Sequence, residues 1–168
     1  PTTANSPASA NDSTNTWMTL PTTAASGNLG GFVSTTFTLI RPSHSPIFEC
    51  TIKMDSTITT ERVWIGLVSA DVTNVDTLAA GTKFLGFRWS TVAADVGFCP
   101  VQNDGTTQYV GSPIGTVVAG NTYKLRIRID GDNHLAYFSV NDSAEQSPGS
   151  NFPAVATDMG FVCRVITT

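Results

Sequence analysis

The chain has 168 residues, of which 40% are hydrophobic and only 13% are charged. This length is sufficient for one domain with a substantial core, and the charged fraction is about half of the roughly 25% usual for globular domains, so Ser, Thr, Asn and Gln must supply much of the surface polarity. Nine Lys and Arg against thirteen Asp and Glu give a net charge of −4, which disfavours nucleic acid as a partner, and no apolar run reaches the roughly 20 residues of a membrane-spanning helix.

The first 16 residues contain no large apolar side chain and consist mostly of Ser, Thr, Asn, Ala and Pro. Burial of such side chains cannot offset the entropy lost on ordering the backbone, so residues 1–16 are predicted to form an extended or disordered N-terminal arm. Two alternatives remain open, a linker to a preceding domain and an arm that lies over a neighbouring subunit. Residues 17–168 are predicted to form a single domain.

Short runs rich in β-branched and aromatic residues follow, separated by turns that contain Pro, Gly, Asn or Asp. Residues 62–68 are apolar on both faces, which is typical of a central strand covered on both sides, and Gly66 within them indicates a bulge or a close approach of another backbone. The longest connection, 69–82, has room for one short helical turn. The predicted strands are 32–40, 47–54, 62–68, 83–89, 97–102, 106–110, 122–129, 135–140 and 159–166.

The clearest pattern lies between residues 121 and 142, where polar and apolar side chains alternate. A period of two over residues 122–129 predicts a half-buried strand, with three cations on the face opposite the apolar set. A tight turn at residues 130–133 contains an Asp-Gly pair, and residues 135–140 then form a second strand. The apolar set is Tyr123, Leu125, Ile127 and Ile129, and the cations are Lys124, Arg126 and Arg128.

Many short strands with frequent turn signals and no amphipathic helix predict an all-β sandwich, and the lack of a fixed repeat disfavours a propeller or solenoid. Five segments carry a more specific resemblance: Arg62–Leu67, Phe84–Trp89, the turn Asn103–Thr107, Tyr123–Ile127 and Ala136–Asn141. Their order resembles concanavalin A-like (laminin-G-like) domains, in particular those of bacteriophage virion and tail-fibre proteins. The resemblance implies an antiparallel jelly-roll β-sandwich with an adhesive, structural or carbohydrate-binding role, and glycoside hydrolases form a minority of such domains.

Sugar recognition commonly combines an aromatic ring with polar side chains that hydrogen-bond to hydroxyl groups. Trp89 with Arg88 at a strand end, and Tyr109 beyond the turn at Asn103 and Asp104, are the candidates for such a site. For Trp89, packing in the core or at its rim is the competing interpretation.

A calcium ion would require clustered oxygen ligands, and Asp130, Asp132 and Asn133 provide one such cluster. The competing interpretation is a hairpin turn in which these residue types simply suit the backbone conformation. No other cofactor is indicated by the sequence.

Catalytic patterns are weak in this chain. Glycoside hydrolysis needs two converging carboxylates, and Glu49, Glu61 and Glu145 do not have the E-x-D-x-x-E spacing of the glucanases with this fold. Three dispersed cysteines at positions 50, 99 and 163 lack zinc-site spacing and are predicted to be buried thiols, with one disulfide plus one free thiol as the alternative. The chain is therefore predicted not to be an enzyme.

The sequence favours a surface-exposed structural or adhesion module of a virion or extracellular appendage, such as a fibre, spike or decoration protein. Its expected partners are other copies of itself or other virion proteins, with cell-surface glycans as a further possibility. A carbohydrate-binding, lectin-like module is the alternative. A capsid shell protein is disfavoured because the arm carries no Lys or Arg with which to bind a genome.

Overall fold

The computed structural model of the chain describes residues 8–11, 16–20, 26–34, 37–38, 40–73 and 75–168. These residues form eleven strands and one short 3-10 helix, η1 (Pro42–His44). The strands are β1 (Ala8–Asn11), β2 (Thr16–Thr19), β3 (Leu29–Val33), β4 (Ile47–Lys53), β5 (Glu61–Val68), β6 (Lys83–Ser90), β7 (Cys99–Asp104), β8 (Gln108–Val110), β9 (Thr122–Asp130), β10 (Leu135–Val140) and β11 (Gly160–Thr167).

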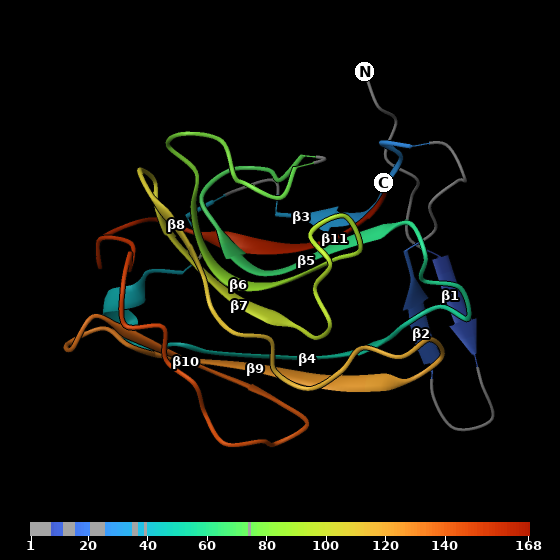
Figure 1. Cartoon of the computed structure of the whole chain (residues 1–168). Helices are drawn as coiled ribbons and strands as arrows, with labels where there is room; N and C mark the ends of the chain where they lie inside the picture. The colour runs from blue at the N-terminus through green and yellow to red at the C-terminus, as the bar shows by residue number, and fades with distance from the viewer. Residues whose placement is uncertain (1–7, 12–15, 21–25, 35–36, 39, 74) are drawn as a thin grey trace.

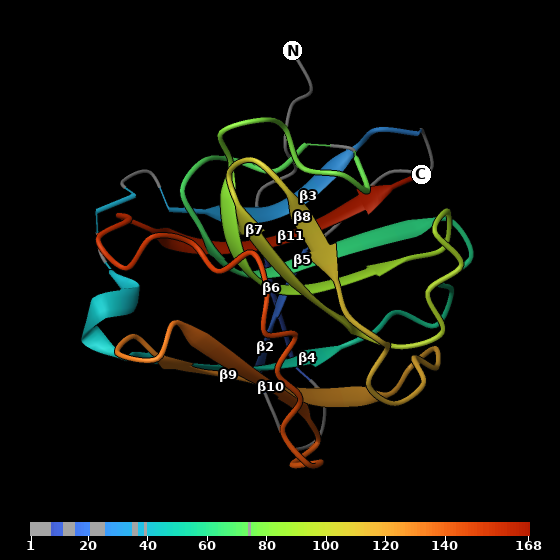
Figure 2. The ribbon, with the colours of Figure 1, turned by 60° about the vertical axis from the view of Figure 1, so that its left-hand side comes forward.

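Two antiparallel sheets lie face to face, a six-stranded sheet above a three-stranded sheet in the view of Figure 1. The large sheet has the strand order β3-β11-β5-β6-β7-β8 and the small sheet the order β10-β9-β4. The chain crosses between the two sheets after β3, β4, β8 and β10, and Figure 2 shows the same two layers after rotation. The predicted antiparallel β-sandwich is confirmed, and these crossings are those of a jelly roll.

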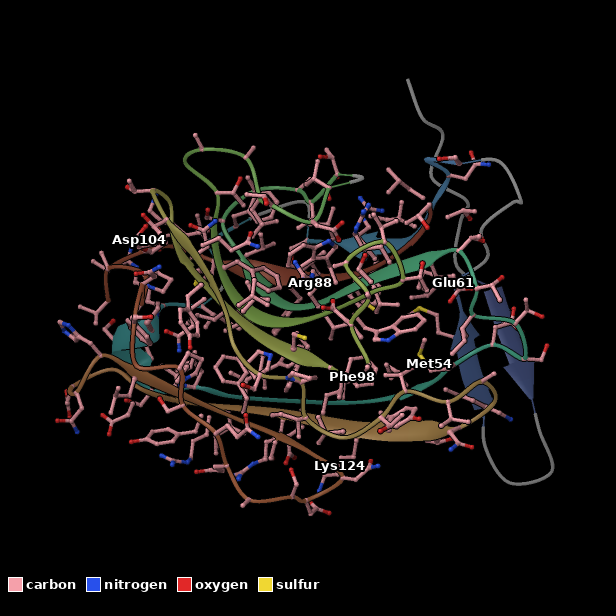
Figure 3. All side chains as sticks on the ribbon, viewed as in Figure 1. Met54, Glu61, Arg88, Phe98, Asp104 and Lys124 are labelled. Atoms are coloured by element: carbon pink, nitrogen blue, oxygen red, sulfur yellow. The ribbon has the colours of Figure 1, made fainter. Side chains whose placement is uncertain are left out.

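The main core fills the space between the sheets. The alternation predicted for β9 is confirmed, because its apolar side chains are buried and Lys124 lies on the outer side of the small sheet (Figure 3). Phe87 of the large sheet meets Phe138 of the small sheet edge to face, with ring centroids 5.4 Å apart. Phe98 also lies between the layers and packs against Phe87. Aromatic packing of this kind therefore joins the two sheets.

A second core covers the outer face of the large sheet. Trp64 and Phe84 pack edge to face there at 5.2 Å between ring centroids, and Val72 and Leu78 of the β5–β6 connection cover them. This connection, residues 69–82, arches over the sheet in Figure 1, and we call it the strap. The prediction that β5 is covered on both faces is confirmed. The described residues of the strap contain no helical turn, so that expectation was wrong.

The first strand of the large sheet differs from its predicted bounds of 32–40. β3 spans Leu29–Val33, and its residues pair with β11. The predicted bounds leave Gly30 and Gly31 outside the strand, but Gly31 has φ +118° and any Cβ there would collide with the Cys163 carbonyl group. Glycine therefore permits the close pairing, and the strand begins earlier than the β-branched run indicates.

The N-terminal region contains one short pair of strands. β1 and β2 run antiparallel and pair with each other, from Ala8 opposite Thr19 to Asn11 opposite Thr16. Among the described strands they join neither main sheet, and they lie beside one end of the sandwich (Figure 1). The predicted arm at 1–16 thus includes an extended strand at 8–11, while residues 1–7 and 12–15 lie outside the described part of the chain.

Candidate functional site

Two of the residues predicted to bind sugar are buried structural residues. Trp89 faces the inter-sheet core and is 4% exposed, so its ring offers no face to a ligand. Arg88, on the opposite side of β6, donates from Nε and Nη2 to Asp95 at 2.9 Å and from Nη1 to the Asp76 carbonyl at 3.0 Å. The expectation of an exposed Trp89–Arg88 pair is corrected, because strands covered on both faces leave neither residue at the surface.

Asn103 and Asp104 shape the β7–β8 turn. Asn103 is 4% exposed, and its Oδ1 accepts the backbone N–H of Gly105 at 2.9 Å. Asp104, which lies near the end of the large sheet remote from Glu61 (Figure 3), accepts the N–H groups of Thr106 and Thr107 at 2.7 and 2.8 Å. These backbone hydrogen bonds lower the pKa of the Asp104 carboxyl. Both side chains are therefore engaged in holding the turn.

Tyr109 is the predicted candidate that forms part of a cleft. Its side chain is 39% exposed on β8, the edge strand of the large sheet. The cleft has a volume of about 160 Å³ and lies between the β7–β8 edge and a segment that follows β10. Its lining residues are all uncharged: Pro100, Tyr109, Gly111, Ser112, Gln146, Ser147 and Pro148.

The wall formed by Gln146–Pro148 is held from two sides. The backbone of Gln146 exchanges two hydrogen bonds with Phe138 of β10, at 2.8 and 2.9 Å. The preceding residue, Glu145, accepts hydrogen bonds from Arg126 and Arg128 on the outer face of the small sheet, at 3.2 and 3.0 Å. The Arg128 hydrogen bond is the main cause of the lowered pKa of Glu145. The ion pairs and the backbone pairing together place the wall opposite Tyr109.

The predicted calcium ligands occupy the β9–β10 turn. Asp130 accepts the backbone N–H of Asn133 at 3.1 Å and its side-chain amide at 2.8 Å, and the amide is the main cause of the lowered pKa of Asp130. These contacts are those of a hairpin turn. Within the described ranges, no group of three or more His, Cys, Asp or Glu is placed to hold a metal ion.

The cysteines do not form a disulfide. Cys50, Cys99 and Cys163 are free thiols, and burial raises the pKa of each to about 12. A thiol with such a pKa is protonated at neutral pH and is a poor nucleophile. Cys99 and Cys163 are buried as predicted, whereas Cys50 is partly buried.

The residues opposite Tyr109 were not identified from the sequence. Along the chain, two further strands and their turn separate Tyr109 from Gln146, Ser147 and Pro148. The sequence around these three residues indicates only a polar loop that contains proline. Short uncharged residues in a loop are common, so this signal does not distinguish a binding wall from a connection. The strand pairing in the two sheets brings the segments together.

No family model and no curated protein matches the chain. Among solved structures, the SPRY domain of human HERC1 is 10% identical with a TM-score of 0.47, over 84% of this chain and 76% of that chain. Sheep galectin-11, solved in complex with glycerol, is also 10% identical, with a TM-score of 0.44 over 87% of this chain and 96% of that chain. At 10% identity, the ligands of these two proteins are not assigned to this chain.

No helix among the described residues is long and apolar enough to span a membrane.

Proposed function

We propose that the chain is a non-enzymatic glycan-binding module and that the sugar occupies the Tyr109 cleft. The observation that carries this proposal is an exposed aromatic ring beside hydroxyl and amide side chains in one concave site. A pyranose has an apolar C–H face that packs on an aromatic ring and hydroxyl groups that bond with Ser112, Gln146 and Ser147.

The chemistry of the cleft supports binding rather than hydrolysis. Glycoside hydrolysis requires a pair of carboxyl groups on either side of the scissile bond. The lining residues include no Asp or Glu, and the nearest carboxylate in sequence, Glu145, is engaged with Arg126 and Arg128. A bound sugar would therefore meet donors and acceptors of hydrogen bonds but no general acid.

A glycan array probed with the full chain tests this proposal. The Tyr109→Ala variant should lose at least about tenfold in affinity for any bound glycan, because Tyr109 is the only aromatic residue among the described residues that line the cleft. Phe32→Ala is the matched control, since Phe32 is similarly exposed at 38% but lies on β3, at the opposite edge of the large sheet. If no glycan binds, or if both variants bind as the parent does, the cleft is not a glycan site.

A structural or adhesion module of a virion or extracellular appendage is the second candidate function. The β1–β2 pair favours it, because this pair lies outside both main sheets and carries Met18, which is 55% exposed. A strand pair of this kind presents backbone edges and apolar side chains to a neighbouring subunit. The partners would be other copies of this chain or other proteins of the same assembly, displayed at its outer surface.

A further inference from the structure

Gln102 on β7 neighbours Pro100 and Tyr109, two residues that line the cleft, although it is not itself a lining residue. Gln102 of β7 is opposite Leu85 on one neighbouring strand and opposite Tyr109 on the other. Residues opposite one another on neighbouring strands share a face of the sheet, as do residues two apart on one strand. The side chain of Gln102 therefore lies on the same face as those of Tyr109 and Pro100, and this face is turned toward the small sheet. Its side chain is fully buried, with a relative exposure of 0%.

The amide of Gln102 has no hydrogen-bond partner in the part of the chain that the structure describes. Among the described residues, the buried side-chain nitrogen and oxygen atoms without a partner are Gln102 Nε2, Gln102 Oε1 and Ser150 Oγ. Ser150 lies two residues beyond Pro148, so these unpaired atoms lie on β7 and just after the wall residues, next to residues that line the cleft. An unpaired buried amide destabilises a fold, and its retention is accounted for when a ligand pairs with it.

The groups around this amide define the chemistry of such a ligand. A primary amide has donor hydrogens and an acceptor oxygen, and a hydroxyl group can both donate to it and accept from it. The cleft offers no lining cation for a carboxylate or sulfate, because its seven lining residues are uncharged. An anionic sugar would lose its hydration there without a compensating charge, so a neutral sugar fits better.

We propose that Gln102 is a specificity-determining residue of the glycan site and that its amide binds a hydroxyl group of a neutral pyranoside that enters beside Tyr109. This inference rests on the proposed function of the cleft. It adds the class of sugar and the residue that selects it.

The experiment uses the full chain, labelled with 15N, and titrates it with methyl glycosides of glucose, galactose and mannose. Sialic acid and glucuronic acid are the charged comparison. At least one neutral glycoside should shift the side-chain NH2 resonances of Gln102, and the two acids should bind at least about tenfold more weakly. If the acids bind as tightly as the neutral sugars, the proposed ligand class is wrong.

Gln102→Met separates a ligand contact from a packing role. Met has a similar length and removes the unpaired amide, so the variant should unfold at an equal or higher urea concentration than the parent. Its affinity for the neutral glycoside should nevertheless fall at least about tenfold, because the buried hydroxyl loses its partner. If the affinity of Gln102→Met for the neutral glycoside is unchanged, the amide does not bind the sugar and bonds at most with an enclosed water molecule.

The outcomes distinguish this inference from the proposed function. Loss of binding in Tyr109→Ala with full binding in Gln102→Met overturns the role of Gln102 and keeps the cleft as a glycan site. Absence of any sugar binding overturns both. If Gln102→Met does not fold, the side-chain NH2 resonances of Gln102 in the parent protein provide the test. Resonances that do not shift when the protein is saturated with the sugar contradict a contact between the amide and the ligand.

Discussion

Glu61 begins β5 near the end of the sandwich that is remote from Asp104 (Figure 3). Burial, together with the charge of Asp55, raises the pKa of its carboxyl group from 4.5 to about 7. The folded state therefore holds this proton more tightly than the unfolded state does. The contribution of the neutral Glu61 carboxyl to the free energy of unfolding is therefore fully present below pH 4.5. This contribution is lost as the pH rises to about 7.

Replacement of Glu61 by Gln should remove this pH dependence. Between pH 5 and pH 8, the free energy of unfolding of Glu61→Gln should gain about 1 kcal/mol relative to the parent, a value already reduced for the partial exposure of the group. Urea unfolding at the two pH values measures the difference. Asp55→Asn should lower the pKa of Glu61 and weaken the effect, and a difference that does not change with pH would contradict the assignment.

Individual residues show where sequence reasoning succeeds. Trp64 lies in the apolar run 62–68, which was predicted to be a central strand covered on both sides, and it is fully buried. Trp89 and Gln102 could not be placed in this way. The sequence around a Trp at a strand end is the same whether its ring is buried or exposed. A Gln that lies between Val and Asn has the pattern expected of a residue on the solvent-exposed face of a strand.

At the scale of elements, the strap over the large sheet depends on arginines that point out of that sheet. Arg62 donates to both carboxylate oxygens of Asp76, at 2.6 and 2.8 Å, and Arg164 donates to Asp71 at 3.2 and 2.8 Å. Trp64 adds a hydrogen bond from Nε1 to the Val75 carbonyl at 3.2 Å. Burial would raise the pKa of Asp76, but the hydrogen bonds from Arg62 and Ser90 and the charges of Arg62 and Arg88 outweigh it and hold that pKa below its ordinary value.

Asp76→Ala should destabilise the protein by about 3 kcal/mol, because the variant removes a carboxylate that pairs with a buried guanidinium. The side chain of Arg62 is 6% exposed in this pair. Asp158→Ala is the matched control, since Asp158 pairs with Arg41 at the surface and its loss should destabilise the protein much less. The midpoints of urea unfolding measure both variants, and equal losses would mean that the strap pairs contribute no more than a surface pair.

The strap also shows a limit of sequence reasoning about elements. The hairpin of β9 and β10 was predicted to within one residue, because its alternation and its Asp-Gly turn are local signals. The strap has no such signal. Its Asp71 and Asp76 resemble ordinary loop residues, and their partners lie on strands that only the folded sheet brings beneath them.

At the scale of the whole molecule, the two-sheet architecture could be predicted because turns and alternating strands recur along most of the chain. The cleft could not, since it combines an edge strand of the large sheet with a loop that extends the edge of the small sheet. Sites of this kind depend on which edges the crossings bring together, and a single sequence does not specify that order. The β1–β2 pair poses the remaining question at this scale, which is whether the sandwich acts alone.

If the chain is a subunit of an assembly, its native mass should exceed that of the 17.7 kDa monomer and should depend on the β1–β2 pair. Native mass spectrometry of the full chain, of a chain that begins at residue 20 and of Met18→Lys tests this. The full chain should form a defined oligomer, and the other two should dissociate, because a charged or missing hairpin removes the apolar contact of Met18. Val118→Lys is the control, since Val118 is similarly exposed at 48% but lies outside the hairpin. Far-UV circular dichroism verifies that the shortened chain retains its sheets, and a monomer in every form would leave glycan binding as the better-supported function.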